Sequence, residues 1–166
     1  MARVLVTGGA GYIGSVCAWM LQERGHEVVV FDDLSTGHRW AVRGQLVEGD
    51  VRDRQALRAV LSRGVDGVMH FAAKSLVGES VGDPLKYFDN NVGGTATLMA
   101  CMVEAGVPSL VFSSSCSIYG DPVRLPVDET HPRGPVSPYG RSKQMVEEML
   151  DEVRRSGAIR VSSLRY

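Results

Sequence analysis

Short apolar runs alternate along the chain with longer segments in which apolar residues recur every three or four positions. The short runs lack the polar alternation of a half-exposed strand, which is typical of parallel strands buried on both faces. We predict six strands, of which the third has the weakest pattern: Arg3–Val6, Glu27–Phe31, Gln45–Glu48, Gly67–Phe71, Ser109–Phe112 and Ala158–Leu164.

The longer segments carry the signals of helices. Asp53 is a predicted N-cap, and the pairs Asp83-Pro84 and Ser137-Pro138 each place a capping residue before a proline at the first helical position. Glycines that follow the periodic segments are predicted stops. Four helices are expected: Tyr12–Arg24, Arg54–Ser62, Pro84–Ala105 and Pro138–Arg155.

This alternation of strand and helix predicts an α/β fold, a Rossmann-like doubly wound parallel sheet with helices on both faces. A length of 166 residues indicates one domain, residues 1–166. The stretch Gly120–Pro138 contains five prolines and is predicted to be a long surface loop. Loops of that length inside a domain are usually functional.

Composition excludes several classes of protein. A formal net charge of −1 provides no basic surface for nucleic acid or anionic membranes. No apolar run reaches the roughly 18 residues that span a bilayer. Three cysteines and four histidines are scattered, which argues against a disulfide framework or a metal site and favours a reduced, cytosolic protein. These residues are Cys17, Cys101, Cys116, His26, His38, His70 and His131.

A glycine cluster, TGGAGYIG, joins the first predicted strand to the first helix. In this context Gly8 allows a tight turn, Gly11 lets the backbone approach a pyrophosphate, and Gly14 lets helix and strand pack closely. The free N–H groups of the helix N-terminus would favour phosphate oxygens. The pattern predicts a dinucleotide site, and the alternative is a strand-helix turn without a ligand.

Acidic residues follow the second and third strands. Asp32 lies 18 residues after Gly14, close to the spacing at which a carboxylate accepts hydrogen bonds from the adenosine ribose. Asp33 adds negative charge that would repel a 2′-phosphate, so the predicted cofactor is NAD. Asp50 could reach the adenine from the same crevice, or it could cap the following segment.

Tyr139 and Lys143 are four residues apart at the start of the last helix, so both side chains lie on one face. An ammonium group near a phenol favours the phenolate and lowers its pKa, which would let Tyr139 act as a base. The strand before them ends in Ser113, Ser114 and Ser115, where a hydroxyl could hold the reacting hydroxyl of a substrate. Ser115 is the first candidate and Ser114 the second.

Motifs along the whole chain resemble those of the NAD-dependent epimerase/dehydratase family of extended short-chain dehydrogenases/reductases. The segments that carry the resemblance are TGGAGYIG from Thr7, FDDLSTG from Phe31, EGDVRD from Glu48, HFAAKSLVGES from His70, DNNVGGT from Asp89, SSSCSIYG from Ser113, SPYGRSK from Ser137 and LRY from Leu164.

The resemblance implies roles for individual residues. Tyr139 and Lys143 would be the catalytic pair, with Ser115 as their hydroxyl partner. Several family members carry a lysine where this chain has Ser75, so Lys74 is the candidate for that cofactor contact. The remaining cofactor contacts implied are Tyr12 and Ile13 at the pyrophosphate, Asp32 at the ribose, Asp50 and Val51 at the adenine, and Phe71, Ala72, Ala73 and Asn90 near the nicotinamide.

The activity implied is epimerisation of a UDP-hexose at carbon 4, with UDP-glucose and UDP-galactose as the pair. Related dehydratases carry Asp-Glu where this chain has Cys116 and Ser117, which disfavours dehydration. The resemblance also implies a homodimer, and it implies that residues 1–166 are the N-terminal part of a protein with a further substrate lobe. The chain alone is therefore expected to be inactive. Alternatives are a non-catalytic NAD-binding module and an epimerase of another nucleotide sugar.

Overall fold

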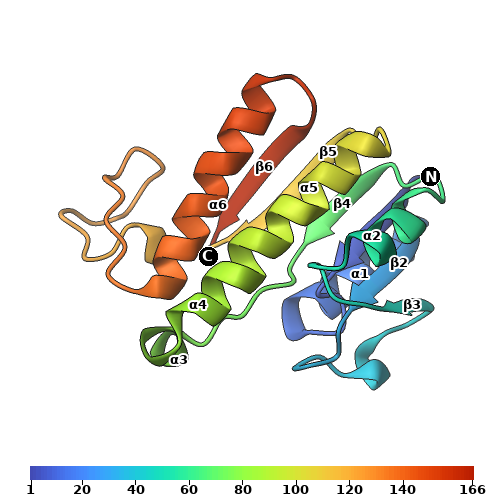
Figure 1. Ribbon diagram of the computed structural model, residues 1–166, viewed down its shortest axis with the longest axis horizontal. Coiled ribbons are helices and arrows are strands. Elements are labelled where there is room, and N and C mark those ends of the chain that lie inside the picture. The colour runs from blue at the N-terminus through green and yellow to red at the C-terminus, as the bar shows by residue number, and fades with distance from the viewer.

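The computed structural model describes all residues from Met1 to Tyr166. Six strands form one sheet in the order β3-β2-β1-β4-β5-β6, and every neighbouring pair is parallel (Figure 1). The predicted parallel sheet is confirmed, including its weakest strand and its last one. The strands are β1 (Arg3–Thr7), β2 (Glu27–Asp32), β3 (Gln45–Glu48), β4 (Gly67–His70), β5 (Ser109–Ser114) and β6 (Arg160–Arg165).

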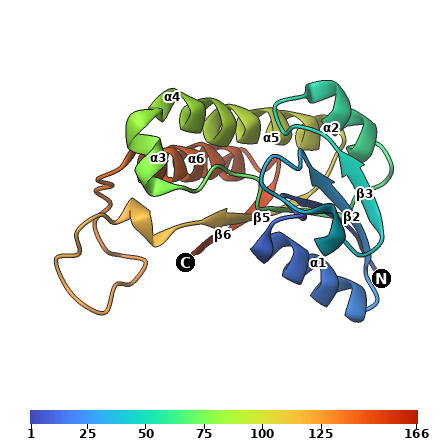
Figure 2. The same cartoon turned by 90° about the horizontal axis from the view of Figure 1, so that it is seen from below.

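Helices cover both faces of the sheet, as predicted (Figure 2). One face carries α1 (Tyr12–Glu23), and the other carries α2 (Arg54–Leu61), α5 (Gly94–Glu104) and α6 (Pro138–Arg155). The order of strands reverses between β1 and β4, so the chain leaves these two neighbouring strands in opposite directions along the sheet. Ligands of such sheets bind beside the carboxyl ends of the strands at this switch point.

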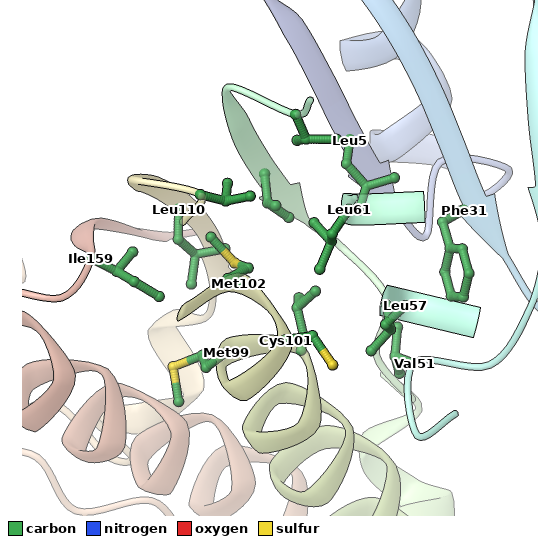
Figure 3. Packing of buried hydrophobic residues seen from close by; sticks show 14 of the residues in the cluster. Leu5, Phe31, Val51, Leu57, Leu61, Met99, Cys101, Met102, Leu110 and Ile159 are labelled. Atoms are coloured by element: carbon green, nitrogen blue, oxygen red, sulfur yellow. The ribbon is translucent and has the colours of Figure 1, made fainter. Parts of the chain in front are cut away.

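The larger part of the core lies between the sheet and the face with three helices. Leu5 and Phe31 of the strands belong to the same buried cluster as Leu57 of α2 and Met102 of α5 (Figure 3). A smaller cluster on the opposite face includes Val6, Val28, Val30 and Ala18. Successive residues of β1 and β2 therefore enter different clusters, which explains why their sequences are apolar without alternation.

The predicted helix Pro84–Ala105 has the expected extent, but it is not one continuous α-helix. It consists of α4 (Pro84–Tyr87), a π-helical segment (Phe88–Gly93) and α5. The π-helical segment buries two adjacent polar side chains, Asn90 and Asn91. Such segments interrupt α-helices mostly at functional sites. The sequence analysis did not predict α3 (Val77–Gly82), a short helix that begins and ends near glycines and is mostly exposed.

The proline-rich stretch before α6 is a loop, as predicted, and extends away from the sheet (Figure 1). His131 within it is buried, and its Nε2 accepts the backbone N–H of Val123 at 3.1 Å. No residue of the loop between Asp121 and Val136 lines the cleft described below. No helix of the structure is long and apolar enough to cross a membrane.

Candidate active site

A cleft of about 430 Å³ lies at the carboxyl ends of the strands. Its walls are formed by the ends of β2 and β5, by the segments that follow β1, β2, β3 and β4, by the start of α1, by the π-helical segment and by the start of α6. The cleft brings together nearly all the predicted site residues: Gly8, Gly11, Tyr12, Ile13, Gly14, Asp32, Val51, Phe71, Ala72, Ala73, Lys74, Asn90, Ser115, Tyr139 and Lys143. Asp50 is the exception, and Ser114, the second candidate hydroxyl, also reaches the lining.

The three glycines of the first turn are required for different reasons. Gly8 has a φ of +70°, and a Cβ there would lie 2.4 Å from the backbone nitrogen of Ala72. A Cβ on Gly14 would lie 2.2 Å from the carbonyl oxygen of Gly8. A Cβ on Gly11 would meet only that same oxygen, at 3.3 Å, and otherwise open space. Gly11 therefore keeps the cleft open, whereas Gly8 and Gly14 keep the turn closely packed.

The helix that follows this turn begins without a side-chain cap. No side chain bonds to the first N–H groups of α1, and its first turn contains no acidic residue. By contrast, Asp53 caps α2 and Ser137 caps α6 through side-chain hydrogen bonds, as the sequence predicts. The positive end of the α1 dipole is thus available to an anion in the cleft.

Asp32 is buried at the end of β2, with 7% of its surface exposed. Its Oδ2 accepts the N–H of Ala10 at 2.9 Å, and its Oδ1 accepts the N–H of Leu34 at 2.8 Å. These bonds fix the carboxylate and leave it further lone pairs toward the cleft. Asp33 is exposed instead, and its Oδ1 accepts both the N–H and the hydroxyl of Ser35.

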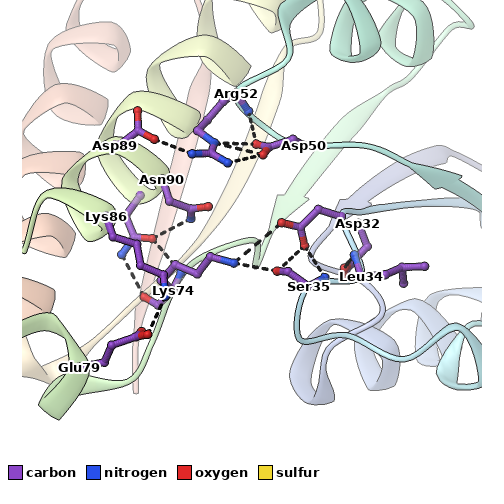
Figure 4. Close-up of polar contacts among 12 residues, drawn as sticks. Asp32, Leu34, Ser35, Asp50, Arg52, Lys74, Glu79, Lys86, Asp89 and Asn90 are labelled. Atoms are coloured by element: carbon purple, nitrogen blue, oxygen red, sulfur yellow. Dashed lines mark hydrogen bonds and ion pairs between the residues drawn. The ribbon is translucent and has the colours of Figure 1, made fainter. Parts of the chain in front are cut away.

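Asp50 makes a contact that its sequence position did not indicate. Its carboxylate accepts the backbone N–H of Arg52 and is held by the guanidinium of the same residue (Figure 4). The hydrogen bonds from Arg52 hold the pKa of Asp50 below its ordinary value. Arg52 also bonds to Asp89 in the π-helical segment. The predicted adenine contact of Asp50 stays a prediction, while its neighbours Gly49 and Val51 line the cleft.

Lys74 crosses from the loop after β4 to the loop after β2 (Figure 4). Its Nζ donates to Ser35 Oγ at 2.7 Å and lies 3.8 Å from Asp33 Oδ2. Asn91 holds the backbone of the same residue, because its Oδ1 accepts the Lys74 N–H and its Nδ2 donates to the Lys74 carbonyl oxygen. The π-helical segment therefore fixes one wall of the cleft.

The three serines at the end of β5 have different surroundings. The Ser113 carbonyl oxygen accepts a hydrogen bond from Lys143 Nζ at 2.8 Å. The Ser114 hydroxyl donates to Glu147 on α6. Ser115 Oγ accepts the N–H of Ser117 and bonds to the Ser117 hydroxyl, both at 3.1 Å. Because a buried carboxylate already engages Ser114, Ser115 has the hydroxyl that is better placed for a ligand.

Tyr139 and Lys143 occupy successive turns of α6, as their spacing predicts. The Nζ of Lys143 lies 5.9 Å from the centre of the Tyr139 ring and 4.8 Å from that of Phe112. Lys143 is 3% exposed, whereas Tyr139 is half-buried. The edge of the Tyr139 ring packs at 86° against Tyr87. The phenol is thus held against a buried ammonium group.

The pKa values of this pair differ from the prediction that Lys143 lowers the pKa of the phenol. Burial raises the pKa of Tyr139, and the Ser115 hydroxyl opposes this effect only in part. Burial also lowers the pKa of Lys143 to about 8, against the charge of Glu147, which raises it. In the free cleft, loss of solvent outweighs the Ser115 hydrogen bond for Tyr139 and the charge of Glu147 for Lys143. A further positive charge beside the phenol would favour the phenolate.

Several residues of the cleft were not predicted. They are Phe31, Ser35, Thr36, Gly37, Gly49, Ser75, Ser113 and Tyr166. Most flank predicted residues in the FDDLSTG and SSSCSIYG segments, so the full length of those motifs was the available signal. Asn91 could have been found from its place beside Asn90. No local pattern marked Tyr166, which β6 brings to the cleft from the far end of the chain.

Comparisons with known proteins agree with this geometry. Residues 4–166 match the model of the NAD dependent epimerase/dehydratase family. A UDP-glucose 4-epimerase of Rhizobium leguminosarum bv. trifolii is 48% identical over 165 residues, which are 98% of this chain and 50% of that protein. A second one, from Streptomyces lividans, is 52% identical over 153 residues, which are 89% of this chain and 46% of that protein.

Solved structures of the same enzyme share the fold. UDP-glucose 4-epimerase from Brucella ovis in complex with NAD superposes with a TM-score of 0.98 at 46% identity and covers 100% of this chain and 52% of its own. The Bifidobacterium longum enzyme in complex with NAD+ and UDP gives 0.94 at 35% identity, over 99% of this chain and 52% of its own.

The chain spans about half the length of the curated relatives that it matches. The family match nevertheless runs over almost all of its residues and includes the glycine turn, Asp32 and the Tyr139–Lys143 pair. The chain therefore belongs to the NAD dependent epimerase/dehydratase family.

Proposed function

We propose that this chain forms the NAD-binding part of a nucleotide-sugar 4-epimerase that interconverts UDP-glucose and UDP-galactose. The observation that carries the proposal is one cleft that combines an uncapped helix N-terminus, the buried Asp32 and the Tyr139–Lys143 pair. An anion site and a candidate base thus lie in one cavity. A module that only binds NAD would not need a phenol held against a buried ammonium group.

The residues of the cleft fit a dinucleotide. The open space at Gly11 and the free N–H groups of α1 would receive the pyrophosphate. The remaining lone pairs of Asp32 would accept the ribose hydroxyls. Phe71, Ala72, Ala73 and Asn90 would border the nicotinamide side, and Lys74 would close the cleft between its two walls.

The chemistry at carbon 4 of the sugar needs a hydride acceptor and a base. NAD, when bound, supplies the acceptor and the donor of hydride, and its oxidised ring adds positive charge. Tyr139 would take the proton of the sugar 4-hydroxyl, because Lys143 and that added charge favour its phenolate form. Ser115 would hold the same hydroxyl in place, and Tyr139 would return the proton after the sugar turns in the site.

The substrate, the assembly and the location of the protein are proposed on separate grounds. UDP-hexose as substrate is inferred from relatives of about twice this length, and galactose metabolism follows from that pair of sugars. A homodimer is supported by exposed apolar residues on neighbouring helices, among them Val81, Leu85, Val103 and Met145. The three cysteines are free, which is typical of a reducing compartment, and we propose the cytoplasm.

Calorimetric titration of the chain with NAD and with NADP tests the cofactor. NAD is expected to bind more tightly, because Asp32 and Asp33 disfavour a 2′-phosphate. Asp32→Ala should weaken NAD binding by about 1–3 kcal/mol, roughly fivefold to 150-fold, since hydrogen bonds to a charged group are lost.

Asp66→Ala is the matched control. Asp66 also accepts a backbone N–H, from Arg3, but this contact lies at the amino end of the strands. Its replacement should leave NAD affinity unchanged. Tighter binding of NADP than of NAD, or equal loss in both variants, would contradict the proposed cofactor site.

A further inference from the structure

A buried carboxylate stands behind the Tyr139–Lys143 pair. Glu147 lies one helical turn after Lys143 on α6, and only 3% of its surface is exposed. The proposed reaction assigns it no proton and no contact with the cofactor. A glutamate is almost never buried this completely unless other groups compensate its charge. Its partners therefore indicate what it does.

Those partners come from three separate segments. Glu147 Oε1 accepts hydrogen bonds from the Ser114 hydroxyl at 2.5 Å and from Arg165 Nε at 3.0 Å. Its Oε2 accepts from Arg165 Nη2 at 2.6 Å and lies 3.2 Å from Arg133 Nη2. Glu147 thus joins α6 to the last residues of β5 and β6 and to the loop before the helix.

The contact with β5 bears directly on the lysine. Ser114 lies between Ser113, whose carbonyl oxygen accepts the Lys143 ammonium, and Ser115, the candidate substrate hydroxyl. Helix α6 therefore holds this strand end twice, through Lys143 to the backbone and through Glu147 to the Ser114 side chain. Two fixed points one helical turn apart prevent the strand end from rotating relative to the helix.

Glu147 also supplies charge. The groups around Lys143 are Tyr139 on α6, the aromatic ring of Phe112 on β5 and His70 on β4, and burial keeps His70 neutral. The cations Arg165 on β6 and Arg133 in the loop bond to Glu147. Glu147 is the acidic group that raises the pKa of Lys143 against the larger effect of burial.

We propose that Glu147 is a positioning residue of the site: it fixes the end of β5 against α6, and its negative charge keeps Lys143 in the ammonium form that Tyr139 requires. The inference deepens the proposed function and rests on it for the role of Tyr139. The hydrogen bonds from Ser114 and Arg165 to Glu147, and the one from Lys143 to the Ser113 carbonyl oxygen, do not depend on the identity of the sugar.

The inference is tested by measuring the pKa of Lys143 by NMR. The measurement is feasible because the chain contains only three lysines. Lysine labelled with ¹³C at Cε gives one signal for each, and the signals of Lys74 and Lys86 serve as internal references. Glu147→Gln keeps the size of the side chain and removes its charge. We expect the pKa of Lys143 to fall by about one pH unit in this variant.

Glu148→Gln is the matched control, since Glu148 is the next residue of α6 and is exposed. The titration of Lys143 should not change in it. Arg133→Met removes a positive charge instead of a negative one, at a partly exposed residue that pairs with Glu147. This variant therefore tests the inference even if Glu147→Gln fails to fold. Removal of that cation should raise the pKa of Lys143.

An unchanged pKa of Lys143 in both Glu147→Gln and Arg133→Met would overturn the inference. A higher pKa of Lys143 in Glu147→Gln would overturn it as well. Calorimetry with NAD on the parent chain separates this outcome from failure of the proposed function. Absence of NAD binding by the parent would refute the cofactor site, whereas the Lys143 titration reports on Glu147 alone.

Discussion

Burial lowers the pKa of two nitrogen bases beneath the cleft and leaves them with different charges at neutral pH. Burial lowers the pKa of His70 to about 3, and the charge of Lys143 lowers it further. The neutral ring is satisfied on both sides by hydroxyls, from Thr7 at 2.6 Å and Thr95 at 2.9 Å. Lys143 has a pKa of about 8 and donates to a carbonyl oxygen. At neutral pH the site therefore holds one buried positive charge, close to Tyr139.

At the residue scale the hydroxyl of Tyr139 is the group whose loss should matter most. Tyr139→Phe retains the ring that packs on Tyr87 and removes the acid–base group. In a protein extended to the length of the relatives, we expect epimerase turnover to fall by about a hundredfold or more, the contribution of a general base. The assay follows conversion of a UDP-hexose to its 4-epimer.

Calorimetry with NAD accompanies that assay. Affinity for NAD should remain within a few-fold of the parent, which shows that the variant still folds and binds. Turnover close to that of the parent would exclude Tyr139 as the base.

At the element scale the first helix and its turn act as one unit. The N-terminus of α1 is free of side-chain caps, and its first turn packs on the glycine turn through Gly14. The glycine turn also packs against the loop after β4, because Gly8 lies against Phe71 and Ala72. A displacement at Gly14 is therefore expected to reach both walls of the cleft.

Gly14→Ala would place a methyl group 2.2 Å from the carbonyl oxygen of Gly8. Because backbone must move to admit it, we expect a loss of about 1–3 kcal/mol in the free energy of unfolding, measured in urea, together with weaker NAD binding. Gly78→Ala is the control, as no atom lies within 4 Å of its Cβ position. Equal unfolding midpoints for the two variants would contradict this account of the turn.

At the scale of the whole molecule, His70 ties the two sheet halves to the helical layer. It lies on β4, and its hydrogen-bond partners Thr7 and Thr95 belong to β1 and α5. These elements meet at the point where the order of strands reverses. Protonation of His70 would require either an unpaired buried charge or the opening of this junction, so the stability of the chain depends on the neutral ring.

The pH dependence follows from the sign of that shift. The folded pKa of about 3 lies below the ordinary value of 6.5, so the unfolded chain takes up the proton first. The stabilisation is complete above pH 6.5 and is lost as the pH falls toward 3. Urea unfolding should show a loss of about 2 kcal/mol between pH 7 and pH 5 from this group.

His70→Asn keeps a polar side chain but removes the group that titrates. The free energy of unfolding of this variant should depend less steeply on pH over the same range. His38→Asn, at an exposed position, serves as the control and should follow the parent. Parallel curves for the parent and His70→Asn would show that another group controls acid stability.

Local signals in the sequence predict all six strands, most of the helices and the types of residue in the site. Apolar runs buried on both faces identify the strands, because their side chains enter two different clusters. Asp53 and Ser137 mark helix starts through local hydrogen bonds, and Gly14 marks a turn whose constraint lies within a few residues, at Gly8 and Gly9. Such signals are readable because sequence neighbours produce them.

The partners of those residues depend on contacts between distant parts of the chain. Lys74 bonds to Ser35 across 39 residues of sequence, and Ser114 turns to Glu147 across 33. Arg52, which pairs locally with Asp50, also bonds to Asp89 across 37 residues. Partners of this kind are chosen by the packing of strands and helices that are distant in sequence, and burial then sets the pKa values. No local pattern contains that information.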